Sequence, residues 1–492
     1  MTLVHRILYP DPIETLAAYR KARGGNGLAR ARELEPEAIV AELEASGLRG
    51  RGGAGFPTGR KWRTMLANES PVLATTVVVN AAEGEPGTFK DRTILRNDPY
   101  QVLEGALIGA LAVGARTIIV ATKQGFDIEL ARLRGAIAEL TDAGWLGDID
   151  IQVFEGPHEY LYGEETALLE TLDGRYPLPR VAPPYRRGVV EVVEHDDDAT
   201  SGSGLPAHVE MASATDESLA PPALVDNVET FANVAHILAR GADWFRTEGT
   251  EQSPGTIVCT ITGATRRHGV GEVLMGTPLR EAIDEIGGGA REGRRIIGVL
   301  PGVSNAIIPA SALDTPLTYE SMAAIGSGLG SAGFIVLDDA DDPVSVAAGA
   351  SRFLAVESCG QCVPCKLDGL RISQLLAECC ALPRDAEFAI AELHKRIDSV
   401  ADRARCSLAT QQQVVAQSVF DHFGDSIEAH LEGRAGATEP YPIAELVDIV
   451  DGQALVDVRH FHKQPDWTYN PVDSGQLPAE RLGEHRRPEQ LS

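Results

Sequence analysis

The sequence predicts a multidomain α/β protein, with a small α+β domain and a helical domain after the α/β part. Its 492 residues exceed what one hydrophobic core usually organises, so we expect roughly two to four domains. In the first half, short β-branched segments alternate with helix-like segments, which is typical of a parallel or mixed sheet covered by helices. After residue 250 short strands and glycine turns predominate, and after residue 343 the pattern is mainly helical.

The individual elements follow from local apolar patterns. Apolar residues at helical spacing predict helices, and short β-branched runs predict buried strands. We expect helices within 1–48, 102–113, 126–141, 223–248, 277–286 and 343–434, and strands at 75–80, 117–120 and 149–153.

Domain boundaries are expected at 1–250, 251–340 and 341–435, with a tail at 436–492. Residues 186–222 interrupt the first domain, because they are acidic, contain a Gly/Ser patch and hold few large apolar side chains. Such a composition predicts a solvated insertion. The tail contains prolines and no cysteine, and it predicts an extended arm that packs on a neighbouring protein.

Charge and composition exclude several classes. A net charge of −27 argues against nucleic acid and against binding to an anionic membrane surface. The sequence has no run of about 18 apolar residues, and its first residues lack the pattern of a signal peptide. Seven cysteines, an odd number, fit a reducing compartment. We therefore expect a cytoplasmic protein without direct membrane insertion.

The most specific pattern is a group of cysteines. Cys359, Cys362 and Cys365 have the spacing C-x2-C-x2-C, and Cys406 follows at a distance. Three thiolates in one tight loop plus a distant fourth are typical of a [4Fe–4S] cluster. Four-thiolate zinc is the competing metal, although zinc sites usually pair two C-x2-C turns. The remaining alternative is a set of buried structural cysteines.

A glycine-rich loop at 50–59 is the second strong pattern. Gly50, Gly52 and Gly55 match G-x-G-x-x-G, but a helical pattern precedes them where a dinucleotide-binding fingerprint requires a strand. With Gly53 and Gly59, the loop still lets the backbone approach a flat or phosphorylated ligand closely.

The side chains around this loop suit the same ligand. Arg51, Arg60 and Lys61 are candidates to neutralise phosphate charge, and Phe56 is a candidate to stack on a ring. The alternative is a glycine-rich surface turn.

Asn80 follows the first expected strand, where ligands of open α/β sheets bind. Glu83 and Glu85 come next and could accept hydrogen bonds from ribose hydroxyls. The alternative is a polar loop in which residues 90–92 form a surface charge cluster.

Two further polar segments are, in isolation, best interpreted as helix starts. Glu164 and Glu165 follow a strand, and they either belong to a site or open the next helix, where negative charge is favourable. Asp226 or Asn227 similarly suits the N-cap of a helix.

Together these motifs resemble one family. The chain resembles the NADH-oxidising flavoprotein (51 kDa, or F) subunit of respiratory complex I, which also occurs as the diaphorase subunit of NAD-dependent formate dehydrogenases and hydrogenases. The resemblance covers about residues 15–435. It rests on motifs in the family order: the loop at 50–62, and the segments 80–88, 163–167, 227–230 and 357–365 with Cys406.

The resemblance implies a role for each matching residue. The glycine loop (Gly50, Arg51, Gly52, Gly53, Gly55) and the Asn80 segment with Glu83 and Glu85 would cradle FMN, with Lys61 reaching toward the flavin. Tyr160, Gly163, Glu164 and Glu165 would line the flavin and nicotinamide side, and Asn227 and Thr230 the FMN phosphate. Phe56 and Tyr185 would stack on the NADH adenine, and Cys359, Cys362, Cys365 and Cys406 would bind the [4Fe–4S] cluster.

The implied chemistry is hydride transfer from NADH to FMN, followed by single electrons to the cluster and on to a partner. No general acid or base is obligatory, so the catalytic contribution of Glu164 and Glu165 would be electrostatic and positional. NADH is expected over NADPH, because Glu83 and Glu85 would repel a 2′-phosphate.

The resemblance also implies the architecture and partners. Residues 251–340 would form a ubiquitin-like domain, and 341–435 a helical bundle carrying the cluster. Expected partners are a small thioredoxin-fold [2Fe–2S] subunit and further iron–sulfur or catalytic subunits, which would hold the chain at the membrane periphery if the complex is membrane-bound. Three functions remain open: a complex I-like subunit, a formate dehydrogenase or hydrogenase diaphorase, and a cluster-only scaffold.

This chain departs from the family at several positions. Ala82 replaces an Asp in the FMN loop, and Asp226 replaces the first Asn of an Asn-Asn pair. A carboxylate beside a flavin phosphate is repulsive unless it is protonated or turned away. Tyr162 replaces a small residue, Tyr185 replaces Phe, and the insertion at 186–222 has no counterpart.

Overall fold

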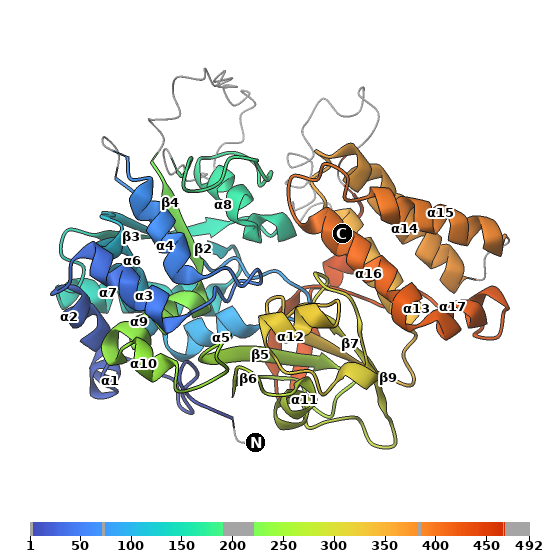
Figure 1. Ribbon diagram of the computed structural model, residues 1–492, viewed down its shortest axis with the longest axis horizontal. Coiled ribbons are helices and arrows are strands. Elements are labelled where there is room, and N and C mark those ends of the chain that lie inside the picture. Colours follow the sequence, from blue (N-terminus) through green and yellow to red (C-terminus); the bar gives the residue numbers. More distant parts are fainter. Residues whose placement is uncertain (1–2, 71–73, 190–220, 382–384, 466, 468–492) are drawn as a thin grey trace, which may run out of the picture.

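The computed structural model describes residues 3–70, 74–189, 221–381, 385–465 and 467. Most of the acidic insertion expected at 186–222 and the tail beyond 467 therefore lie outside the described residues. Figure 1 shows three units in chain order: an N-terminal α/β unit in blue to green, a mixed β unit in yellow-green, and a helical unit in orange.

The N-terminal unit is built on a four-stranded parallel sheet with the strand order β3-β2-β1-β4. Its strands are β1 (Thr76–Asn80), β2 (Thr117–Lys123), β3 (Asp150–Gly156) and β4 (Ala223–Asn227). In the register, Asn80 pairs with both Ala121 and Asn227. The carboxyl ends of β1 and β4 therefore lie side by side.

Helices cover both faces of this sheet because its strands are apolar on both sides. Val77 and Val79 pack into the core with α6 (Pro99–Ala112), α7 (Asp127–Asp142) and α9 (Val228–Arg240). Val78 faces the other side, where α8 (Glu165–Leu172) packs. The remaining helices of this unit are α1 (Leu16–Lys21), α2 (Asn26–Ala31), α3 (Pro36–Ser46), α4 (Thr58–Ala67), α5 (Lys90–Asn97) and α10 (Ala242–Phe245).

The structure corrects one expected element. Residues 223–248 were expected to be helical throughout, but their first five residues form strand β4 at the edge of the sheet. The helix begins only at Val228, with Asn227 as its N-cap. The correction moves Asp226 and Asn227 to the carboxyl end of a parallel strand, where ligands of such sheets bind.

The second unit is a five-stranded mixed sheet with the order β6-β5-β9-β7-β8. Its elements are β5 (Thr256–Gly263), β6 (Gly269–Leu274), α11 (Leu279–Gly287), β7 (Ile296–Pro301), β8 (Ile308–Pro309), η2 (Ala310–Ala312), α12 (Tyr319–Ala324) and β9 (Gly333–Asp338). This unit has its own apolar core, which α11 closes on one side.

The third unit consists of five helices that share one core. They are α13 (Pro343–Glu357), α14 (Val363–Cys380), α15 (Ala386–Ser399), α16 (Leu408–His422) and α17 (Gly424–Leu431). Cys359 lies between α13 and α14, and Cys406 lies just before α16.

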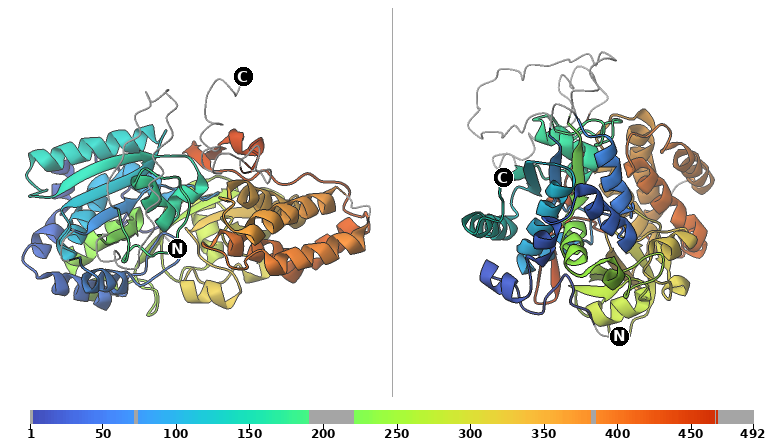
Figure 2. Two further views of the ribbon diagram at one scale, coloured as in Figure 1. Left: turned by 90° about the horizontal axis from the view of Figure 1, so that it is seen from above. Right: turned by 60° about the vertical axis from the view of Figure 1, so that its left-hand side comes forward.

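The described part of the tail differs from the extended arm that its composition suggested. It forms the antiparallel hairpin of β10 (Leu446–Val450) and β11 (Gln453–Val456), followed by η3 (Val458–Phe461). Glu445 pairs with Lys123 at 2.8 Å, so the hairpin packs on the chain's own N-terminal unit. The left view of Figure 2 shows this red segment lying back beside that unit.

No helix among the described residues combines the length and apolar character needed to cross a bilayer.

Candidate functional site

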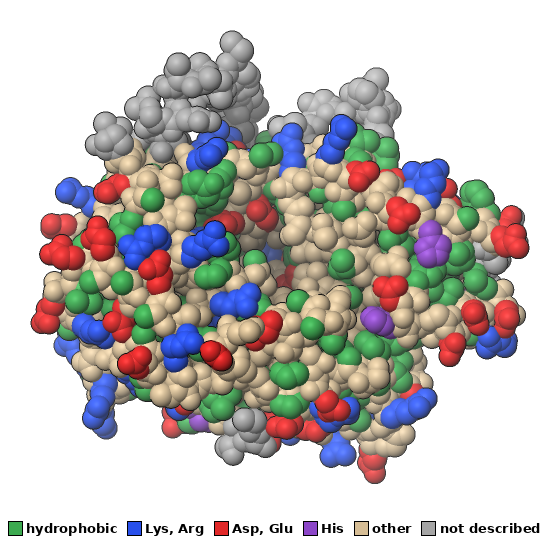
Figure 3. Space-filling view, in the orientation of Figure 1, with side chains coloured by type: hydrophobic (Ala, Val, Ile, Leu, Met, Phe, Trp, Pro, Cys, Tyr) green, Lys and Arg blue, Asp and Glu red, His purple; other side chains and the backbone are tan. Residues whose placement is uncertain are grey.

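A cavity of about 640 Å³ opens where the three units meet, at the carboxyl ends of β1 and β4. Its volume lies within the usual range for small-molecule and cofactor sites. Figure 3 shows the hollow near the centre of the molecular face, between the N-terminal and helical units.

The glycine loop forms one wall with its backbone. Gly50, Gly52, Gly53 and Gly55 all line the cavity. Gly53 and Gly55 have φ values of 126° and 61°, a left-handed region that favours glycine. A side chain on Gly55 would also meet the ring of Tyr319 at 2.4 Å. Conformation therefore favours glycine at both positions, and Gly55 is also required for space.

The cationic side chains of this loop divide into two groups, contrary to the expectation that all would face a phosphate. Arg51 is buried away from the cavity, and its guanidinium donates to the carbonyls of Arg49, Pro254 and Thr256. Arg60 instead lies 5.8 Å from the ring centroid of Phe56. Phe56 lines the cavity and is 48% exposed, so its ring is available at the rim.

Lys61 is the cation of this loop that reaches the cavity. Its ammonium is 2.5 Å from Glu165 and 3.6 Å from Asp226. Burial favours the neutral amine, but the two carboxylates outweigh burial and raise the pKa of Lys61. The ammonium therefore remains charged.

Asp226, the unusual residue of β4, is held by its own surroundings. Its Oδ2 accepts a hydrogen bond from the indole of Trp62 at 2.7 Å, and Lys61 lies on the other oxygen. Burial raises the pKa of Asp226 against the opposing effect of Lys61. This carboxyl is thus oriented by Trp62 and balanced by Lys61.

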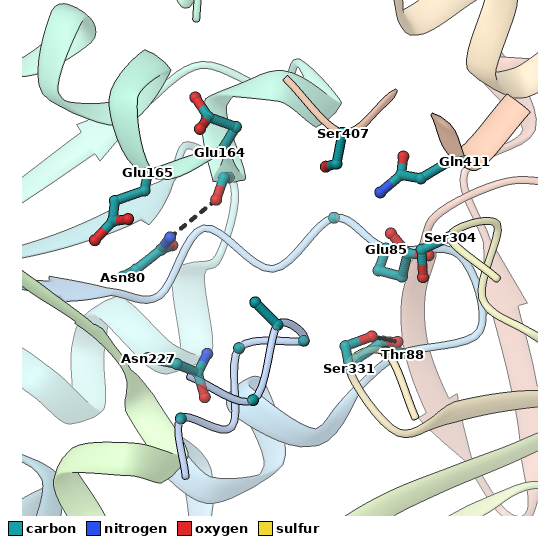
Figure 4. A pocket seen from close by; sticks show the side chains of 18 of the residues that line it. Asn80, Glu85, Thr88, Glu164, Glu165, Asn227, Ser304, Ser331, Ser407 and Gln411 are labelled. Atoms are coloured by element: carbon teal, nitrogen blue, oxygen red, sulfur yellow. Dashed lines mark hydrogen bonds between the residues drawn. The ribbon is translucent and has the colours of Figure 1, made fainter. Parts of the chain in front are cut away.

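Asn80 fixes the shape of a second wall of the cavity, next to the glycine loop. Its amide donates to the Gly163 carbonyl at 2.9 Å, and its Oδ1 accepts from the Ala82 amide at 3.2 Å. Figure 4 shows the first of these bonds next to Glu164 and Glu165. Tyr162 points away from the cavity into the core beneath α8, so this departure leaves the wall unchanged.

Asn227 sits on a buried charge cluster that no sequence pattern indicated. Its Oδ1 accepts from Lys90 at 3.0 Å and from the Glu229 amide at 3.1 Å, and its Nδ2 donates to Asp91 at 2.7 Å. Lys90 also pairs with Asp91 and Glu229, at 2.7 and 3.0 Å.

Lys90 is only 1% exposed, so the surface charge cluster suggested for residues 90–92 is wrong. The carboxylates around Lys90 raise its pKa against the effect of burial. Burial raises the pKa of Asp91 to about 6 although Lys90 is adjacent. Thr230, which also lines the cavity, accepts from the Arg51 amide at 2.9 Å.

Glu83 and Glu85 are engaged with the protein itself. The Glu83 carboxylate pairs with Arg92 at 2.9 Å and accepts from the Asp91 amide. Glu85 accepts from the hydroxyl of Tyr160 at 2.5 Å and from the Val303 amide at 2.7 Å, and burial raises its pKa. The expectation that both carboxylates are free for ribose hydroxyls is therefore not met.

Glu164 has the capping role that the sequence left open, and it also lines the cavity. Its carboxylate accepts from the amides of Thr166 and Ala167 at 3.0 and 2.9 Å, which starts α8. Burial raises the pKa of Glu164. Glu165 lines the cavity as well and is joined to Lys61.

Tyr185 does not reach this cavity. Its ring packs on the core of the N-terminal unit, with Arg186 5.9 Å from the ring centroid. The predicted contact of Tyr185 with a ligand here is not supported.

The opposite wall comes from residues that no sequence motif indicated. Ser304 and Ser331 come from loops of the second unit, and Ser407 and Gln411 come from the start of α16. Figure 4 shows Ser304 and Gln411 across the cavity from Asn80 and Glu165.

Beside this cavity lies a smaller one, lined by all four predicted cysteine ligands. Cys359, Cys362, Cys365 and Cys406 are partly buried and form no disulfide. Burial raises the pKa of Cys406 to about 12 and that of Cys359 above its usual value, so these two thiols would be protonated without a bound metal. Gln361 donates to the sulfur of Cys359 at 3.4 Å.

The donor set suits a [4Fe–4S] cluster. Cys359, Cys362 and Cys365 come from the segment that enters α14, and Cys406 comes from the segment just before α16. Each thiolate of a [4Fe–4S] cluster binds a different iron, so four thiols around one cavity match what this cluster requires.

A backbone-walled cavity for a flat, charged ligand beside a four-thiol site defines an electron-transfer flavoprotein with an iron–sulfur cluster. Comparison with family models agrees. Residues 43–236 match the Nuo51 FMN-binding domain, residues 258–303 an SLBB domain, and residues 345–430 the NADH-ubiquinone oxidoreductase-F iron-sulfur binding region.

Related proteins cover nearly the same length. The chain is 34% identical to an F-type subunit of the NADH-quinone oxidoreductase of Rhizobium meliloti, over 88% of this chain and 98% of that protein. It is 35% identical to the NADP-reducing hydrogenase subunit HndC of Solidesulfovibrio fructosivorans, over 86% and 82%. A crystal structure of an NAD+-reducing [NiFe]-hydrogenase superposes with a TM-score of 0.70 at 28% identity, over 85% of this chain and 67% of that chain.

The chain therefore belongs to the family of F subunits of NADH-quinone oxidoreductases. The expected family, the FMN and [4Fe–4S] cofactors and the NADH oxidoreductase class are confirmed.

Proposed function

We propose that this chain oxidises NADH for a multisubunit oxidoreductase, with FMN in the 640 Å³ cavity and a [4Fe–4S] cluster on the four cysteines. The observation that carries the proposal is the shared wall of the two sites. Cys406, Leu161 and Leu408 line both cavities. A single layer of side chains thus separates the two cofactor sites, as electron transfer between them requires.

FMN, when bound, supplies the chemistry: it accepts a hydride from NADH and returns electrons one at a time. The residues of this chain bind and orient. The glycine loop offers close backbone approach, and the N-terminus of α9 beside Thr230 favours a phosphate. The exposed ring of Phe56 at the rim supports the proposal that it stacks on the adenine of NADH.

The charged side chains set the electrostatics of the cavity. Lys61 holds a positive charge on the wall that carries Glu165. A fixed cation beside a flavin stabilises the electron-rich form of the ring. The Glu165 carboxylate partly neutralises the Lys61 charge and therefore weakens this stabilisation. No side chain needs to donate or accept a proton during hydride transfer, so Glu164 and Glu165 act by position and charge.

Partner subunits must carry the electrons away. Apart from the four cysteines of the cluster site, the chain has Cys259, Cys379 and Cys380, all buried in hydrophobic cores. The proposed partners are a thioredoxin-fold [2Fe–2S] subunit and further iron–sulfur or catalytic subunits, through which the chain would be peripheral to a membrane.

Two kinds of host complex are compatible with this chain. The match to HndC favours a hydrogenase diaphorase, and the match to the Rhizobium meliloti protein favours a complex I-like enzyme. Affinity purification from the native source separates the two by the co-purifying catalytic subunit. A cluster-only scaffold is less well supported, because the glycine wall is intact and Lys61 and Trp62 accommodate Asp226.

An anaerobic NADH titration of the purified protein tests the proposal. We expect bleaching of the flavin absorbance near 450 nm at about one NADH per FMN, and a weaker response to NADPH. Lys61→Gln should reduce bound FMN about ten-fold, because it leaves Glu165 and Asp226 uncompensated beside the ligand. An iron–sulfur spectrum without flavin and without an NADH response would contradict the dehydrogenase function.

A further inference from the structure

The C-terminal segment returns to the cluster site after the hairpin. Residues 458–465 run along α13, where the Arg352 guanidinium donates to three of their carbonyls, those of His460, Phe461 and Lys463, at 3.0, 3.3 and 2.7 Å. The His460 ring stacks on Phe353 of the same helix with ring centroids 5.2 Å apart. One helix thus anchors the segment at several points.

An ion pair between the half-buried Lys463 and a buried carboxylate fixes this segment next to the cysteine loop. The Lys463 ammonium lies 2.6 Å from Glu357, the last residue of α13. The other oxygen of Glu357 accepts from the Tyr160 amide at 3.2 Å. The pair therefore joins the C-terminal segment, the start of the cysteine loop and the wall of the larger cavity.

Trp467 covers the loop itself. Its indole nitrogen donates to the Ser358 carbonyl at 2.9 Å, and Lys366 lies 4.8 Å from its ring centroid. A Cβ on Gly360 would meet the Trp467 ring at 3.1 Å, so the ring lies directly on the turn between Cys359 and Cys362. Trp467 is only 5% exposed, which shows how closely it packs on this turn.

We propose that residues 458–465 and Trp467 form a strap that shields the cysteine loop from water and thereby lowers the reduction potential of the bound cluster, with Trp467 as the positioning residue. This inference rests on the cluster site of the proposed function. A reduced cluster carries one more negative charge, which water stabilises, so excluding water disfavours reduction.

The decisive measurement is an EPR-monitored redox titration of the full-length holoprotein. Trp467→Ala should admit water and shift the reduced-to-oxidised ratio about ten-fold toward reduced at a fixed potential, which is about 59 mV for a one-electron couple. Trp467→Phe keeps an aromatic cover and loses one hydrogen bond, so its potential should stay close to that of the native protein.

The rate of iron release to a chelator provides a second measurement. It compares two variants that each remove one positive charge from the strap. Lys463→Gln removes the cation paired with the buried Glu357 carboxylate and should speed iron release several-fold, as Trp467→Ala should. Arg459→Gln removes one positive charge from the same segment, where Arg459 forms its ion pair with the neighbouring Asp457, and it should leave the rate unchanged.

The possible outcomes are distinguishable. An unchanged reduction potential in Trp467→Ala would contradict the proposed role of the strap. An unchanged rate of iron release in Lys463→Gln would contradict it as well. If Trp467→Ala fails to assemble a cluster, the comparison of Lys463→Gln with Arg459→Gln decides by chelation rate. Absence of any cluster signal in the unaltered protein would instead contradict the proposed function.

Discussion

At the scale of single residues, Asp98 shows how burial sets a protonation state. One of its oxygens accepts from the amides of Tyr100 and Gln101 at the start of α6. The other oxygen is buried with no hydrogen-bond partner among the described residues. Burial raises the pKa of Asp98 to about 7, far above its usual 3.8. The carboxyl is therefore protonated in the folded protein over most of the acidic range.

This state predicts a pH-dependent effect of Asp98→Asn. The unfolded carboxyl ionises near pH 3.8 and the folded one only near 7, so this group stabilises the fold below 3.8 and loses that contribution as pH rises to 7. Asparagine keeps the capping oxygen and does not ionise. Relative to the native protein, the variant should therefore gain about 1.4 kcal/mol per pH unit between pH 4 and 7. Urea unfolding across that range measures the slope, and a pH-independent difference would contradict the protonated state.

Asp226 illustrates what a sequence can and cannot indicate about one residue. Because Asp226 replaces an Asn of the family pattern, the sequence indicated a carboxylate that would repel a flavin phosphate. The solution adopted by the protein depends on Trp62 and Lys61, which lie on helix α4, far from Asp226 in sequence. Local pattern alone cannot supply that pairing.

At the scale of elements, α6 and α9 cross in close contact because Gly105 has no side chain. A Cβ on Gly105 would lie 1.9 Å from the Phe231 carbonyl oxygen, which is backbone and cannot rotate away. One turn later, a Cβ on Gly109 would meet only the side chains of Phe231 and Trp62, at 3.2 and 3.4 Å.

Gly105→Ala should therefore force the two helices apart and lower the free energy of unfolding by about 1–3 kcal/mol. Gly109→Ala is the matched control. Its mild crowding is offset by a gain in helix propensity of up to about 1 kcal/mol, so its stability should stay near the native value. Denaturant unfolding measures the free energy of unfolding of both variants. Equal decreases would show that close contact between α6 and α9 at Gly105 is not required for stability.

Many elements were predictable, and the expectation of a helix where strand β4 lies has a physical explanation. Val77 and Val78 lie in a β-branched run that is unmistakable as a strand. Strand β4 has only five residues and ends in Asp226 and Asn227, and Asn227 is also the N-cap of α9. Because the N-cap residue of the helix is also the last residue of this short strand, the strand looks in sequence like the beginning of the helix. Only its pairing with β1 reveals it.

At the scale of the whole molecule, a buried charge cluster joins the first two units. Lys90 pairs with Asp91 and Glu229, and Glu229 also accepts from the Val258 amide of β5. Arg51 of the glycine loop lies 3.8 Å from Glu229 and reaches the carbonyls of the second unit.

Lys90→Met should remove the cation closest to two buried carboxylates, leave Glu229 with only the more distant Arg51, and lower the free energy of unfolding by about 3–5 kcal/mol. Arg434→Ala removes a cation from an exposed pair with Glu432 and should cost less than about 1 kcal/mol. Thermal and denaturant unfolding of the two variants test the difference. A small effect of Lys90→Met would mean that the cluster is not what holds the units together.

The site was predictable only where its residues form local motifs. The glycine loop, Asn80, Asn227 and the cysteines were identified because each motif has a chemical reason that is visible in sequence. Ser304 and Gln411 come from other units and are ordinary polar residues, so only the three-dimensional arrangement reveals them. Tyr185 was placed in the cavity by resemblance alone, and the structure puts its ring on the core.

Because the cavity walls come from three units that are far apart in sequence, they are synthesised at different times. The ribosome delivers the glycine loop first, the Ser304 and Ser331 loops about 250 to 280 residues later, and the wall at Cys406 and Gln411 about 360 residues after the glycine loop. A nascent chain therefore lacks a complete cavity until the third wall has emerged. We therefore expect flavin to bind stably only after the third unit has folded, and chains terminated before Cys406 to lack the cofactor.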